Sequence, residues 1–137
     1  MNNDAPRSGE MTVPVSIGEV VDKITILEIK SERLSDPARL ENVREELKQL
    51  GVAFRSQFPH ADAELEGLIA SLKAVNTSLW EIEDDIRECE RAKTFDEHFV
   101  ELARAVYRTN DKRAALKRKI NVLLGSQLIE EKSYSAY

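Results

Sequence analysis

The sequence predicts an all-α protein, in which a long antiparallel helical hairpin packs with two shorter N-terminal helices in a four-helix bundle-like fold. Apolar residues recur every three or four positions along most of the chain, which is the spacing of amphipathic helices. Five Gly and four Pro among 137 residues fit few loops. Hydrophobic residues at 42% and charged residues at 33% favour helices with a charged surface over disorder.

The chain divides into three parts by composition. Residues 1–12 are polar and are expected to be a flexible N-terminus. Residues 13–125 form a single helical domain, which at this length can bury a core without disulfides or metals. Residues 126–137 are a C-terminal tail in which charges alternate with two tyrosines.

The first two helices are expected at residues 16–34 and 37–57. Ser16 and Glu19 have the spacing of a capping box, which opens the first helix. That helix is apolar over much of its circumference, so it should lie deep or at an interface. Asp36 and Pro37 form a cap followed by a proline in the first turn, and Pro59 ends the second helix.

The third and fourth helices are expected at residues 61–93 and 97–124. Leucine and isoleucine hold a heptad pattern through the third helix. Asp96 caps the fourth helix, and Gly125 suits the left-handed conformation that closes it. The short connection makes these helices antiparallel neighbours of ~40 to 50 Å each, whereas the first two measure only ~27 to 32 Å. Apolar surface left uncovered at one end predicts a homodimer.

Polar residues interrupt the apolar stripe of the fourth helix. They are Thr109, Asn110, Arg113 and Lys117. Counting outward from the turn places Arg113 level with Asn76 of the third helix. A buried guanidinium needs partners, because leaving it unpaired costs roughly 1 to 3 kcal/mol or more. We therefore expect acidic side chains to turn toward it, the candidates being Asp22, Glu28 and Glu83.

Three interpretations of this polar layer stay open. It fixes the register of the helices, as a buried Asn does in a coiled coil. Alternatively, it is a pocket that binds phosphate or carboxylate. The residues of such a pocket would be Arg113, Lys117, Lys23, Asn76 and Asn110. In the third interpretation these residues face solvent where the hairpin frays.

Other side-chain clusters predict no chemistry. The acidic run at residues 81–85 is interpreted as a solvated helix face, and Cys89 as a core residue. His60 and His98 lie far apart and lack metal-ligand spacing to Cys89, so we expect no metal, no cofactor and no identifiable catalytic residue. The tail either packs back on the bundle or docks into a partner, with Tyr134 and Tyr137 as the docking side chains.

Charge and targeting signals bound the location and the partners. A net charge of −5 argues against general binding to nucleic acid or to anionic membranes. The polar start lacks the apolar stretch of a secretory signal, and no run approaches the ~20 apolar residues that span a bilayer. A single Cys fits a reduced compartment. We expect a soluble cytoplasmic protein without membrane insertion.

Three segments resemble a family of small, uncharacterised bacterial helical proteins. They are Ser16–Lys30, Asn110–Ala114 and Glu130–Tyr134, and the resemblance spans residues 13–137. This family, a domain of unknown function, is sometimes associated with surface-glycan or glycosyltransferase genes. The heptad regularity and the absence of a reactive constellation favour a non-catalytic helical interaction or accessory protein as the leading hypothesis, and the resemblance implies a link to surface-glycan metabolism. The alternative is a protein or enzyme that binds a small anion, such as a phosphorylated sugar or a dicarboxylate, in the polar layer.

Overall fold

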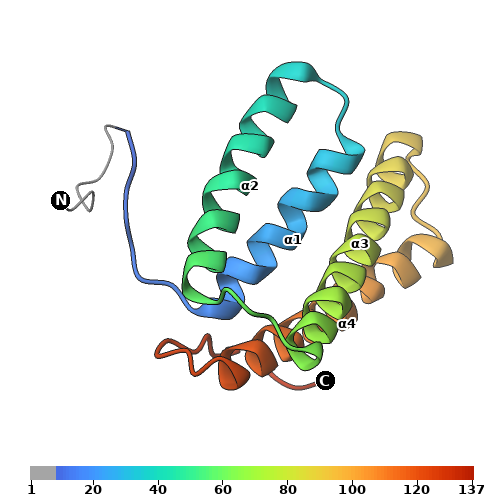
Figure 1. The fold of residues 1–137 in the computed structure, drawn as a ribbon. Coiled ribbons are helices and arrows are strands. Elements are labelled where there is room, and N and C mark those ends of the chain that lie inside the picture. The colour runs from blue at the N-terminus through green and yellow to red at the C-terminus, as the bar shows by residue number, and fades with distance from the viewer. Residues whose placement is uncertain (1–8) are drawn as a thin grey trace.

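The structure is a computed structural model that describes residues 9–137, and within this range it is all-helical (Figure 1). Its helices are α1 (Ile17–Arg33), α2 (Pro37–Gln57), α3 (Ala63–Ala92) and α4 (Glu97–Leu123). The predicted fold class is confirmed, and each predicted boundary lies within two residues of the observed one. Of the expected flexible segment, residues 1–8 lie outside the described residues, and residues 9–12 contain no helix.

Each helix begins at a side chain that caps its free backbone N–H groups. Ser16 Oγ accepts a hydrogen bond from Glu19 N at 3.2 Å, as the capping-box spacing predicted. The carboxylates of Asp36, Asp62 and Asp96 do the same for the three later helices. At the other end of α4, Gly125 adopts a φ of +66°, the left-handed conformation expected after the helix.

The helices are arranged around α1. The hairpin of α3 and α4 has the largest contact, and α1 lies against both of these helices (Figure 1). Among the described residues, α2 packs along α1 alone. The last residue of α1, Arg33, forms an ion pair of 3.2 Å with Glu81, and α3 continues beyond this point to Ala92. The shorter α1 therefore covers only part of the hairpin.

The core lies where α1 joins the hairpin. Val21 of α1, Leu65 and Leu72 of α3, and Ile120 of α4 form a fully buried cluster. The half-buried side chain of Phe54 reaches this cluster from α2. Burial of these side chains is the main force that holds the helices together, since each contributes about 1.5 to 3 kcal/mol relative to exposure.

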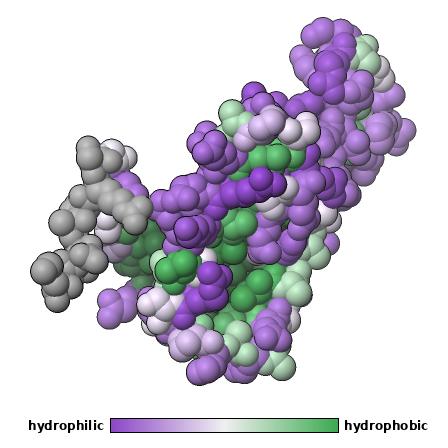
Figure 2. Space-filling view, turned by 45° about the horizontal axis from the view of Figure 1, so that its top comes forward, coloured by the Kyte–Doolittle hydropathy of each residue, from purple (hydrophilic) through white to green (hydrophobic). Residues whose placement is uncertain are grey.

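One side of α1, between α2 and α3, is incompletely covered. Val20 and Ile24 of α1 and Leu47 and Phe54 of α2 are all half-buried. Figure 2 shows hydrophobic side chains in the middle of this side of the molecule, bordered by hydrophilic ones. We call these four residues the open apolar face.

Candidate functional site

The polar layer lies where α1 crosses α4 at very short range. The backbone N–H of Gly18 donates to Asn121 Oδ1 at 2.6 Å. A Cβ at Gly18 would lie only 2.5 Å from the carbonyl oxygen of Lys117, so only glycine permits this approach. The crossing places the first half of α1 against residues 113–121 of α4.

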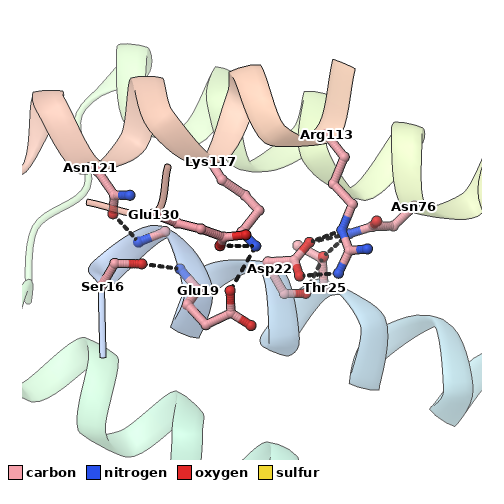
Figure 3. A network of polar contacts seen from close by, with 10 residues as sticks. Ser16, Glu19, Asp22, Thr25, Asn76, Arg113, Lys117, Asn121 and Glu130 are labelled. Carbon is pink, nitrogen blue, oxygen red and sulfur yellow. Dashed lines mark hydrogen bonds and ion pairs between the residues drawn. The ribbon is translucent and has the colours of Figure 1, made fainter. Parts of the chain in front are cut away.

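Asp22 is the centre of the layer and is 1% exposed (Figure 3). Its carboxylate accepts hydrogen bonds from Arg113 Nε at 2.9 Å and from Arg113 Nη2 at 2.5 Å. It also accepts one from Asn76 Nδ2 at 2.9 Å, and the hydroxyl of Thr25 accepts another from the same amide at 2.9 Å. The bidentate Arg–carboxylate geometry is the strong form of this pairing, and it ties α1 to both α3 and α4.

Lys117 occupies the second position of the layer, one turn of α4 beyond Arg113. Its side chain is 11% exposed, and Nζ donates to Glu19 at 2.7 Å and to Glu130 at 2.8 Å (Figure 3). Glu19 comes from the first turn of α1, whereas Glu130 comes from the C-terminal tail. A further pair, Arg118 with Glu131 at 3.1 Å, lies on the outer side of α4.

The surroundings shift the pKa values of both central groups. Burial alone would raise the pKa of Asp22, but the hydrogen bonds from Arg113 and Asn76 and the nearby cationic charges outweigh it and lower the pKa. Burial alone would lower the pKa of Lys117, but its hydrogen bonds to Glu130 and Glu19 outweigh burial and raise it. Both groups are therefore charged at neutral pH.

The layer is fully satisfied by its own residues. Within residues 9–137, every buried side-chain nitrogen or oxygen atom has a hydrogen-bond partner. The two cations, Arg113 and Lys117, face three carboxylates. Glu19 and Glu130 accept two of the three hydrogen bonds that the Lys117 ammonium can donate, so an anion at Lys117 would compete with both carboxylates.

The structure brings together three of the predicted ligand-binding residues. Arg113, Lys117 and Asn76 lie in one layer with Asp22, the expected acidic partner of Arg113. Asn110 is exposed on α4 and lines a cavity beneath the tail, so it does not join the buried network. Whether any of these residues binds a ligand stays a prediction.

Three predicted members of the layer lie elsewhere. Lys23 pairs with Glu46 of α2 at 3.1 Å, because it is on the opposite side of α1 from α3. The expectation that Glu28 and Glu83 turn toward Arg113 was wrong. Glu28 contacts Lys73 of α3 at 3.7 Å, and Glu83 contacts Arg87 within α3 at 3.8 Å.

The tail packs back on the bundle, which was one of its two predicted arrangements. The ring of Tyr137 packs edge-on against Tyr107 with centroids 5.1 Å apart, and its hydroxyl donates to Asp111. Tyr134 is 83% exposed and contributes to the cavity lining. Docking of these tyrosines into a partner stays a prediction.

Several residues of the layer were missed by the sequence reasoning. Glu19 was interpreted only as part of a capping box, although its carboxylate binds Lys117. Glu130 was interpreted only as a tail charge. A glycine inside a helical pattern indicates close packing, so Gly18 could have predicted the close approach of another helix. Nothing in the local sequence pattern distinguished Asn121.

Metal and membrane features are absent from the described part of the chain. No group of three His, Cys, Asp or Glu side chains among residues 9–137 is placed to hold a metal ion. Cys89 is buried, as expected of a core residue. None of the described helices has the length and apolar character needed to cross a bilayer.

The fold and the site define an all-α protein in which a buried ion network ties α1 to a long helical hairpin. The chain belongs to DUF6165, a family of unknown function, whose model matches residues 11–137. The predicted resemblance to an uncharacterised family is thereby confirmed. Neither a curated protein nor a solved structure matches the chain.

The Asp22–Arg113 pair makes stability depend on pH in acid. Because the folded protein lowers the pKa of Asp22 below its usual 3.8, its stabilising effect is complete above that value and is lost as the pH falls further. We expect the difference in free energy of unfolding between wild type and Asp22→Asn to shrink as the pH falls below about 4. Urea denaturation followed by circular dichroism measures the free energy of unfolding of each protein. All other carboxylates are the same in both proteins, so their pH dependence cancels in the difference. A difference that is constant with pH would contradict this role.

Proposed function

We propose that this protein is a non-catalytic helical interaction protein that works as a homodimer through its open apolar face. The observation that carries the proposal is the placement of α2, which packs on α1 alone and leaves apolar side chains half-buried beside it. A second copy would cover these side chains and gain the free energy of burying them.

Helical spacing places the apolar residues of α1 on this face. Lys23 marks the side of α1 toward α2, because it pairs with Glu46. Glu28 marks the side toward α3, because it pairs with Lys73. At 100° per residue, Val20 and Ile24 lie on the arc between these two positions.

The charged side chains that border the open apolar face favour a second copy of this chain over a partner whose surface is uniformly acidic or uniformly basic. Lys23 and Glu46 border it on one side, and Glu28, Glu32 and Lys73 border it on the other. A two-fold interface places the same patch on both subunits, so it must be self-complementary. Borders that carry both signs meet this requirement, because a lysine of one copy can face a glutamate of the other.

Two further parts of the proposal have separate sources. The polar start and the single Cys favour the cytoplasm, and the resemblance implies a bacterial accessory protein of surface-glycan metabolism. The satisfied polar layer supports a structural part for Arg113 and Lys117 in this protein, because their charges already hold the helices together.

Oligomeric state tests the proposed dimer. Light scattering coupled to size-exclusion chromatography should give twice the chain mass of 15.5 kDa for wild type. Ile24→Glu should give the mass of one chain, because a carboxylate in the interface would lose its hydration without gaining a partner. Circular dichroism verifies that the variant keeps its helices.

The matched control is Val122→Glu, which places the same charge at a 66% exposed valine of α4, outside the open apolar face. This variant should remain a dimer. A wild-type protein that is monomeric at every concentration would refute the proposal, as would a Val122→Glu variant that dissociates in the same way as Ile24→Glu.

A further inference from the structure

The C-terminal segment, residues 128–137, lies along α4 without forming a helix or strand (Figure 1). Glu130 binds Lys117, and Glu131 binds Arg118. Farther along the segment, Lys132 and the hydroxyl of Tyr137 both bind Asp111. The segment therefore runs antiparallel to α4 and contacts it through a series of side chains.

The two sides of these ion pairs differ in how firmly they are held. The side chain of Lys117 is 11% exposed and sits in the folded core of the layer, whereas those of Glu130 and Glu131 are 60% and 74% exposed. Exposed ion pairs contribute little to stability and weaken as salt screens them. The side chain of Arg118 is itself 53% exposed, but both cations project from α4, whereas both carboxylates belong to a segment without helix or strand. The carboxylates are therefore the partners that can leave while the helices stay folded.

A cavity of about 980 Å³ lies between the segment, α4 and the start of α1. The folded helices contribute three cations to its lining, Arg113, Lys117 and Arg118. Arg113 is already paired with Asp22, whereas Lys117 and Arg118 pair with Glu130 and Glu131 of the segment. Once the segment leaves, Lys117 keeps only Glu19 and Arg118 loses this partner, so both can receive carboxylates from another molecule.

We propose that this surface, the tail site, binds an acidic peptide segment of a partner protein, and that residues 128–137 occupy it in the free protein as a tethered competitor. The structure itself supplies the model for the ligand, because its occupant is a peptide without helix or strand that carries two successive carboxylates. Glu130 reaches inward to Lys117, and Glu131 reaches outward to Arg118.

Tethering sets how strongly a partner must bind. A short linker holds the segment at an effective concentration on the order of millimolar, so an incoming peptide must outcompete it. Weakening the chain's own segment should therefore strengthen the binding of a peptide added in solution. This gain separates a competitor from a segment that merely packs on the surface.

The experiment measures binding of a fluorescent peptide with the sequence of residues 126–137 to the full-length chain by anisotropy. Glu130→Gln/Glu131→Gln should bind it at least about tenfold more tightly than wild type, because its own segment competes less. These positions are exposed, so the fold should survive, and circular dichroism verifies it. Adding Arg118→Gln to this variant should weaken its binding of the peptide, because the second glutamate of the peptide loses its partner, whereas the neighbouring Lys119→Gln should leave the affinity unchanged.

Three outcomes of the binding experiment would overturn the proposal. Equal peptide affinity in wild type and the double variant would show that the segment does not occupy the site. If a peptide whose two glutamates are replaced by glutamine binds as tightly as the original peptide, the site does not recognise acidic residues. Displacement of the peptide by inorganic pyrophosphate at low concentration would show that the site takes any anion.

The proposed tail site and the proposed dimer can each be refuted without refuting the other. The Glu130→Gln/Glu131→Gln variant leaves Ile24 and the open apolar face intact, so its mass by light scattering should equal that of wild type. A fall to the mass of one chain would show that the bound segment comes from a second copy, and this would overturn the assignment of the site to a different partner protein.

Discussion

Replacing Gly18 with alanine is expected to destabilise the protein by about 2 kcal/mol, although alanine is the better helix former. The added Cβ would lie 2.5 Å from the carbonyl oxygen of Lys117 and 2.9 Å from Asn121 Oδ1. The first of these atoms belongs to the backbone, so the contact is relieved only if α1 and α4 move apart. That movement would also lengthen the 2.6 Å hydrogen bond from Gly18 N to Asn121.

Gly67→Ala is the matched control for this prediction. Gly67 lies within α3, and a Cβ there would meet nothing within 4 Å. The same chemical change should therefore stabilise the protein, by about 0.5 to 1 kcal/mol, through helix propensity. Urea denaturation followed by circular dichroism gives both values. Stabilisation by Gly18→Ala of the same size would show that the close crossing of α1 and α4 does not exist in solution.

Helix boundaries were predictable because their signals are local. A cap such as Ser16 or Asp96 satisfies N–H groups three residues away, and Gly125 adopts its conformation for reasons within its own turn. The pairing of Asp22 with Arg113 was also within reach. An arginine that interrupts an apolar stripe requires an acidic partner, and few carboxylates were candidates.

Which carboxylate pairs with which cation depends on the angles between helices, and sequence spacing does not determine these angles. Glu28 and Glu83 seemed as suitable as Asp22, yet the crossing of α1 directs Glu28 to Lys73 and leaves Glu83 beside Arg87. The amphipathic pattern of α2 likewise predicted a buried face but not the neighbour that covers it. The path of the tail has no periodic signal, so its contact with Lys117 was not predictable.

Asp22→Leu is expected to cost about 3 kcal/mol of stability, because it removes one partner of a buried ion pair and leaves the other. The Asn76 amide would keep Thr25 as an acceptor. Most of the lost stability would therefore come from Arg113, whose partly buried guanidinium would lack its carboxylate partner. That side chain is 29% exposed, and partial rotation into water keeps the cost near the lower end of the usual range. Glu101→Leu breaks an exposed pair with Arg104 and should cost less than about 1 kcal/mol.

The double variant Asp22→Leu/Arg113→Leu decides what the ion pair does. Replacing both partners removes the stranded charge, so the double variant should be more stable than Asp22→Leu alone, and the two effects should not add. Urea denaturation of all four chains of the cycle gives the coupling free energy. A double variant as stable as wild type, but with broadened amide resonances by NMR, would mean that the polar layer fixes the register of α1 against the hairpin rather than its stability. Effects that simply add would mean that Asp22 and Arg113 act independently, contrary to their 2.9 Å contact.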